Sequence, residues 1–139
     1  MLLKFLAKYR DAGLLVMRIG LGVCFFLHGL LKLMGGREKL AGVGSAMDLI
    51  GIPGSPQFWG IVAAVTESFG GILLIVGLAC RPICLVLTFT MVMATADLYF
   101  NAKMRTLADF SQVSHPLKMA FVFLGLAFVG PGRFSVDKD

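Results

Sequence analysis

Four apolar stretches follow one another along the chain, without the alternation of polar and apolar positions that barrel strands would show. The first three approach the roughly 20 residues that a helix needs to cross a membrane, and the fourth is shorter, so we expect it to borrow its start from the turn at residues 113–115. Lipid cannot satisfy free backbone groups, so each stretch is predicted to be a helix. The predicted fold class is therefore an all-α membrane protein, a bundle of four transmembrane helices in a single domain over residues 1–139. The predicted helices cover about residues 13–34, 58–80, 82–101 and 116–130.

Composition supports a membrane location. Hydrophobic residues make up 58% of the 139 residues and charged residues only 15%, whereas soluble domains are nearer half apolar and a quarter charged. The net charge of +5 is scattered over chain ends and loops without a basic block, so it does not indicate nucleic acid. Positive residues number six on the terminal side, counting the Arg81 turn, and four in the two long loops. This bias predicts both termini in the cytoplasm. The first apolar span is too long for the apolar region of a signal peptide, so we expect it to be retained rather than cleaved.

Ionisable residues interrupt the apolar stretches in a regular way. Arg18, His28 and Lys32 fall on one face of the first predicted helix, within an arc of roughly 120°. Glu67 interrupts a stripe of small residues on the second predicted helix, and Asp97 lies near the end of the third. Small residues allow helices to approach closely in lipid, and a charge among them normally faces the bundle interior.

The predicted depths place several of these side chains at one level. Their depths below the outer ends of the helices can be estimated from a rise of about 1.5 Å per residue. At these depths the side chains are expected to line a pocket that opens towards the outer leaflet. Arg18 is expected deeper, with its side chain reaching up to pair with Glu67. The residues of this predicted pocket are Lys32, His28, Asp97, His115, Lys118 and Glu67.

Simpler interpretations stand beside the pocket. Lys32 and Lys118 can be anchors whose ammonium groups reach the interface, and Asp97 and His115 can merely be solvated. Other residues are harder to explain in this way, because a charge near the middle of a membrane costs at least about 2.5 to 3.5 kcal/mol unless it is paired. Arg18 and Glu67 can then form a purely structural ion pair. His28 is either a hydrogen-bonded interior residue or a ligand and proton carrier.

Three motifs together resemble the DoxX family, in the order and spacing of that family. They are R-x-G-x-G-x-x-F-x-x-H-G-x-x-K at residues 18–32, E-x-x-G-G-x-x-L-x-x-G-L-x-x-R-P at residues 67–82, and G-P-G-R-x-S-V-D at residues 130–137. The resemblance spans nearly the whole chain, with Val136 where the family more usually has leucine. It implies a four-helix integral membrane protein of bacteria or archaea. The family is named after a subunit of a thiosulfate:quinone oxidoreductase, and other members are associated with redox stress and with quinone or thiol homeostasis.

This resemblance leads to a functional hypothesis: the chain is the membrane subunit of an oxidoreductase system and binds a quinone or similar molecule inside the bundle. His28 would donate a hydrogen bond to a quinone carbonyl and Glu67 would carry the proton, which makes these two the candidate catalytic residues. Arg18 would keep Glu67 ionised. The expected ligand-binding residues are Arg18, His28, Lys32, Glu67, Asp97 and His115.

The electrons would have to come from a partner, since the sequence carries no flavin, haem or metal motif. Cys80 and Cys84 are one residue too far apart for a C-x-x-C motif, and we expect them to be buried structural residues. A homo-oligomer is also compatible with the apolar outer faces. The alternative function is non-catalytic, either a small-solute carrier or a scaffold for other membrane proteins.

Overall fold

A computed structural model describes residues 3–101 and 107–137 of the chain. Within these ranges every regular element is a helix. In chain order they are the 3₁₀ helix η1 (Lys4–Tyr9), α1 (Arg10–Met34), α2 (Gly36–Gly44), the 3₁₀ helix η2 (Ser45–Ile50), α3 (Pro56–Val76), α4 (Cys80–Asn101) and α5 (Leu107–Val129).

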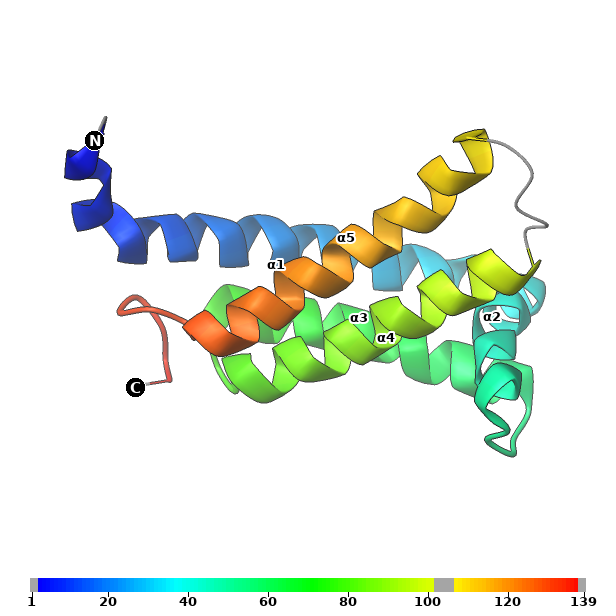
Figure 1. Cartoon of the computed structure of the whole chain (residues 1–139). Helices are drawn as coiled ribbons and strands as arrows, with labels where there is room; N and C mark the ends of the chain where they lie inside the picture. Colours follow the sequence, from blue (N-terminus) through cyan, green and yellow to red (C-terminus); the bar gives the residue numbers. More distant parts are fainter. Residues whose placement is uncertain (1–2, 102–106, 138–139) are drawn as a thin grey trace.

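Four of the described helices are long and apolar enough to cross a membrane, which confirms the predicted fold class. The candidate spans are Phe5–Met34, Pro56–Val76, Cys80–Asn101 and Asp109–Val129. Figure 1 shows the long helices side by side, with α2 and η2 across one end of the bundle and both chain termini at the other end. The membrane protein is therefore multi-pass, with its two ends on the same side.

The boundaries of α3 and α4 follow local signals in the sequence. The Ser55 hydroxyl accepts a hydrogen bond from the Phe58 amide at 3.2 Å, and Pro56 occupies the first helical position, where its missing N–H costs little. The helix ends at Gly77, whose φ of 74° lies in the left-handed region that glycine adopts easily. Pro82 lies in the first turn of α4, as predicted.

The prediction that the fourth helix begins near Pro116, with a start borrowed from residues 113–115, was wrong. Helix α5 already begins at Leu107, and Pro116 lies inside it. A proline in a helix removes one N–H and crowds the carbonyl four residues earlier, which here belongs to Gln112. In Figure 1 the first half of α5 leans away from α1. Of the loop predicted at residues 102–115, residues 102–106 lie outside the described residues and the rest is helical.

Helices α1 and α3 run antiparallel and touch through small residues, as the stripe on α3 predicted. A Cβ atom on Gly22 would lie 2.5 Å from the Gly71 carbonyl oxygen, and a Cβ on Gly71 would lie 2.5 Å from that of Gly22. Further along, a Cβ on Gly29 would collide with the Ala64 carbonyl. Glycine is needed at these crossings because any side chain would push the backbones apart. The contact fixes the register between the two helices.

The long connection between α1 and α3 is folded onto the bundle. Helix α2 packs on the beginning of α3, and η2 packs on both α3 and α4. Gly60 is part of this contact, since a Cβ there would collide with the Leu40 carbonyl. The connection thus covers one end of the helices.

Residues 130–137, which we call the C-terminal strap, fold back over the opposite end. The Asp137 carboxylate accepts hydrogen bonds from the backbone N–H groups of Ala79 at 3.0 Å and Cys80 at 2.8 Å. The Asp137 amide donates to the Gly77 carbonyl at 2.9 Å. These bonds satisfy free N–H groups at the start of α4 and place a negative charge at the positive end of its dipole.

Candidate functional site

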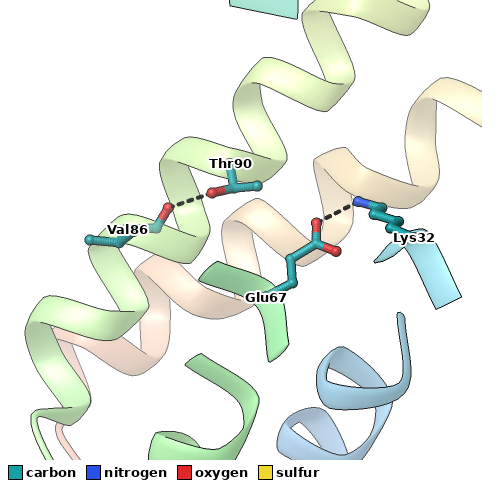
Figure 2. A network of polar contacts seen from close by, with 4 residues as sticks. All are labelled: Lys32, Glu67, Val86 and Thr90. Atoms are coloured by element: carbon teal, nitrogen blue, oxygen red, sulfur yellow. Dashed lines mark hydrogen bonds and ion pairs between the residues drawn. The ribbon is translucent and has the colours of Figure 1, made fainter. Parts of the chain in front are cut away.

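Lys32 and Glu67 form an ion pair inside the bundle. The distance from Lys32 Nζ to Glu67 Oε1 is 2.6 Å (Figure 2). The side chain of Glu67 is 1% exposed and that of Lys32 is 18% exposed, so the pair is almost removed from solvent. A charge at such a position is costly unless it is paired, and each residue supplies the counter-ion that the other needs.

The meeting of these two side chains follows from helix geometry. Side chains on an α-helix tilt towards the N-terminus of their own helix. Lys32 therefore leans back along α1 towards Gly29, and Glu67 leans along α3 towards Ala64. Because Gly29 lies directly against Ala64 in the antiparallel contact, the ammonium and the carboxylate arrive at the same level.

A cleft of about 590 Å³ opens next to this pair, between α1, α4 and α5. Its size falls within the range of pockets that bind small molecules and cofactors. Its polar lining consists of His28, Lys32, Glu67, Gln112 and His115. The other lining residues are apolar or small, including Gly20, Leu21, Cys24, Phe25, Met91 and Met119. The cleft thus combines a cluster of hydrogen-bonding groups with apolar walls.

Two histidines enter the cleft from different helices. His28 stands on α1 with its ring near that of Phe25, at 6.4 Å between ring centroids and an interplanar angle of 30°. Phe25 in turn packs edge-on against buried Phe123, at 4.7 Å. His115 enters from α5, next to Pro116. Both imidazoles are exposed towards the cleft, so each can donate or accept a hydrogen bond there.

A smaller cavity of about 170 Å³ shares Lys32, Glu67 and Ala94 with the cleft. It lies among η2, α3 and α4, and its other lining is largely apolar, with Trp59, Phe89 and Met93 in its walls. Thr90 also lines it, but its hydroxyl donates to the Val86 carbonyl at 3.0 Å (Figure 2). The ion pair therefore borders two cavities.

The cleft's chemistry is that of hydrogen bonding and proton transfer. It offers an ammonium, a carboxylate, two imidazoles and an amide, which can orient carbonyl or hydroxyl oxygens of a ligand. Among residues 3–101 and 107–137, no three His, Cys, Asp or Glu side chains are grouped so that they could hold a metal ion. A small organic molecule with oxygen atoms suits this lining best.

The chain resembles known proteins over nearly its full length. The model of the DoxX family matches residues 13–101. The chain belongs to the DoxX family. Three curated relatives are each 30% identical to it: the Bacillus subtilis protein named "Putative oxidoreductase CatD", an uncharacterized protein of Haemophilus influenzae, and inner membrane protein YqjF of Escherichia coli. The matches cover 94%, 95% and 94% of this chain and 88%, 93% and 94% of the relatives, in that order. No solved structure shows a significant match to this chain.

The predicted pairing of Arg18 with Glu67 in this DoxX protein was wrong. Arg18 is fully buried, but its guanidinium lies beside Gly77 and donates from Nη2 to the Phe134 carbonyl of the C-terminal strap. Glu67 precedes Gly77 by ten residues on α3, about 15 Å along the helix. Arg18 also tilts towards the N-terminus of α1, away from Glu67. It lines neither the cleft nor the smaller cavity, and it binds the C-terminal strap instead.

Two further residues of the predicted pocket lie outside the cleft of this DoxX protein. Asp97 accepts a hydrogen bond from Asn101 at 2.7 Å and lies 3.5 Å from the Ser45 hydroxyl of η2, so it joins α4 to the connection. Lys118 is exposed on α5 and lines neither cavity. The structure thus brings together His28, Lys32, Glu67 and His115, while their role in ligand binding stays a prediction.

Gln112 is a polar residue of the cleft that the sequence prediction missed. The predicted start of the fourth helix near Pro116 left Gln112 in a loop. In the structure Gln112 belongs to α5 and lines the cleft. Gln112 and His115 are three residues apart and share one helix face. If the predicted helix had been extended past Pro116, this spacing would have indicated that Gln112 lies on the same face as His115.

The three cysteines of this DoxX protein lie in two places, Cys24 in the middle of α1 and the other two in the first turns of α4. Cys80 and Cys84 are fully buried in the hydrophobic core, one turn apart on α4, and the C-terminal strap binds the backbone N–H of Cys80. Both are free thiols, as is Cys24, which is exposed and lines the cleft. The burial expected for Cys80 and Cys84 is confirmed.

Proposed function

We propose that this DoxX protein is a membrane subunit of an oxidoreductase system and that its cleft binds the ring of a quinone or similar small redox-active molecule. The observation that carries the proposal is the cleft itself. It places an ammonium, a carboxylate and two imidazoles at the edge of an otherwise apolar space between α1, α4 and α5. Such a combination suits a flat, largely apolar ring with a few polar oxygens.

The polar residues have distinct tasks in this proposal. A quinone oxygen accepts hydrogen bonds, and His28 and Lys32 supply donors on α1. Glu67 carries protons, with Lys32 rather than Arg18 as its counter-ion. His115 and Gln112 approach from α5 and can hold a second ring oxygen. The apolar walls along Gly20, Leu21 and Met119 suit the tail of a lipophilic ligand.

The comparisons support the general assignment. One relative carries the name "Putative oxidoreductase CatD" and another is an inner membrane protein of Escherichia coli. We place this chain in the inner membrane of a bacterium, with both termini in the cytoplasm as the charge bias predicts. The electrons reach the ligand from a soluble or membrane-bound partner.

Ligand binding can be tested on the full chain in lipid nanodiscs. A decyl-tailed benzoquinone should bind with a stoichiometry near one per chain, and lipophilic quinones should co-purify with the protein in mild detergent. Gly20→Leu should weaken binding, because Gly20 lines the cleft and no atom lies within 4 Å of the position of its Cβ, so the new side chain fills the cleft itself.

Gly13→Leu is the matched control. Gly13 stands on the same helix with equally open surroundings, but it does not line the cleft. Equal binding by the wild type and both variants would place the ligand elsewhere. If no quinone binds to the wild type, the proposal fails and a non-catalytic carrier or scaffold explains the fold better.

A further inference from the structure

Cys24 is an exposed thiol in the wall of the cleft. It stands in the middle of α1 and lines this space, whereas Cys80 and Cys84 are fully buried in the core. Cysteine sulfur is an intrinsically strong nucleophile, and reversible binding of a quinone ring makes no use of it. A ring that enters the cleft therefore meets a group that can react with it.

The imidazole of His28 shares a helix face with this thiol. Cys24 and His28 are four residues apart on α1, and both line the cleft. Residues at this spacing are neighbours on a helix surface, and the His28 side chain leans towards the N-terminus of α1, where Cys24 lies. A thiol must lose its proton to act as a nucleophile, and histidine is the commonest base in such a role. The cleft thus holds a nucleophile together with a base.

The surroundings of this pair are those of a functional site. His115 and Gln112 line the same cleft from α5. Glu67 lines it too, and this side chain is 1% exposed while its Oε2 makes no hydrogen bond to any described residue. Buried polar groups are nearly always satisfied, so an exception needs an explanation, and a functional site supplies one. Cys24 therefore differs from a cysteine that merely faces lipid.

We propose that Cys24 forms a covalent thioether with quinones that enter the cleft and carry a hydrogen on a ring carbon. This inference rests on the proposed function and adds a modification site to it. His28 takes the proton from the thiol, which leaves the sulfur free to attack the ring. The adduct keeps the ring in the cleft and closes it to a second ligand.

The reaction needs no further reactant. A C–S bond forms, while the S–H bond of Cys24 and one C–H bond of the ring break. The thiol proton passes through His28 to one ring oxygen, and the proton from the attacked carbon goes to the other. Both ring carbonyls are thereby reduced and the attacked carbon is oxidised, so the electrons balance within the adduct. The product is a hydroquinone attached to the protein.

The test compares two decyl-tailed quinones on the full chain in nanodiscs. The first ring has hydrogen on its free carbons, and the second has methyl groups there, so it can bind but cannot add. We expect mass spectrometry to find one quinone per chain, attached to Cys24, after exposure to the first. The rate should saturate with quinone concentration, because the adduct forms from a bound complex. The methylated quinone should slow the labelling by competition, and Cys80 and Cys84 should stay unlabelled.

Val23→Cys in a Cys24→Ser background is the matched control. Val23 is the adjacent residue of α1, is 43% exposed and lines neither cavity. The new thiol lies at nearly the same depth but outside the cleft, and Leu27 rather than a histidine stands one turn later. Its labelling should rise linearly with quinone concentration and should not be slowed by the methylated quinone.

His28→Gln separates the chemical step from binding. The glutamine cannot take the thiol proton, so the maximal rate of labelling should fall about a hundredfold, the lower end of what a general base contributes. The half-saturating concentration of quinone should stay near the wild-type value, whereas a merely structural role of His28 would change it. An unchanged maximal rate would overturn the assignment of His28 as the base.

The outcomes separate the covalent site from the proposed function. If the methylated quinone does not bind to the wild type and no cysteine is labelled, the proposed function itself fails. If the methylated quinone binds but Cys24 forms no adduct, or reacts no faster than the thiol of Val23→Cys, the covalent site is overturned while reversible binding stands.

Discussion

Lys32 at the end of α1 and Glu67 in the middle of α3 form an ion pair, with 2.6 Å between Nζ and Oε1. Their positions depend on the glycine contacts between the two helices, and the pair borders both cavities. The fold thus holds two opposite charges, at a fixed level of the membrane, against a space that a ligand can enter.

The effects of removing Lys32 and Glu67 on the free energy of unfolding should be far from additive. Removing one partner leaves the other charge buried and uncompensated, so Lys32→Met and Glu67→Leu should each lower the free energy of unfolding by about 3 to 5 kcal/mol. The double variant should recover much of this loss, because two apolar side chains then face each other. Unfolding in detergent with increasing dodecyl sulfate measures all three values, and strictly additive losses would show that the residues are not partners.

His28 should matter for turnover more than for binding. His28→Gln keeps hydrogen-bonding groups of similar size but cannot carry a proton at neutral pH. We expect this variant to fold and to bind quinone nearly as well as the wild type, while quinone-linked electron transfer in native membranes becomes slower. His115→Gln gives the comparison on α5. Unchanged electron transfer in His28→Gln would remove His28 from the list of proton carriers.

The C-terminal strap should protect the buried thiols. Asp137→Ala removes the acceptor for the N–H groups of Ala79 and Cys80, a loss comparable to that of a helix cap, about 0.5 to 2 kcal/mol. Cys80 and Cys84 should then react faster with a membrane-permeant maleimide, since they are fully buried in the native fold. The exposed Cys24 is the internal control, and its rate should not change.

Asp48→Ala is the matched control for the strap. It removes an exposed carboxylate from η2, at the other end of the bundle. The thiol reactivity of this variant should equal that of the wild type. If Cys80 and Cys84 react equally fast in Asp137→Ala and in the wild type, the strap does not shield them.

The orientation in the membrane can be tested with reporters. The charge bias predicts that a reporter fused after residue 139 is cytoplasmic and that one inserted between Gly51 and Ser55 lies outside. Alkaline phosphatase, which is active only outside the cytoplasm, and a fluorescent protein give opposite readouts. The reverse pattern would show the opposite orientation in the membrane, with Cys80 and Cys84 near the oxidising side.

Much of the fold could be predicted from the sequence, because lipid leaves few choices for the backbone. Apolar length identified four helices, and glycine and proline marked the boundaries of α3 and α4. The start of α5 could not be found in this way. Pro116 has the same local signature inside a membrane helix as at its first turn, and neighbouring helices decide between the two.

The candidate site was only partly predictable. Helical periodicity placed His28, Lys32 and Glu67 towards one space, but it could not say which cation meets Glu67. That choice depends on the register between α1 and α3 and on the tilt of each side chain, which are fixed by the contact between Gly29 and Ala64. The contact of Arg18 with the strap could not be predicted either, since Phe134 lies 116 residues away along the chain.

The most direct test of the central claim is to map where a photoreactive quinone attaches. A decyl-tailed azidoquinone is bound to the wild-type chain in nanodiscs and activated by light, and the labelled peptides are sequenced by mass spectrometry. The account predicts labels on the cleft-lining parts of α1, between Gly20 and Lys32, and of α5, between Gln112 and Met119, and predicts that excess unlabelled quinol removes them. Labels confined to lipid-facing positions such as Phe128, or labels that quinol does not displace, would contradict it.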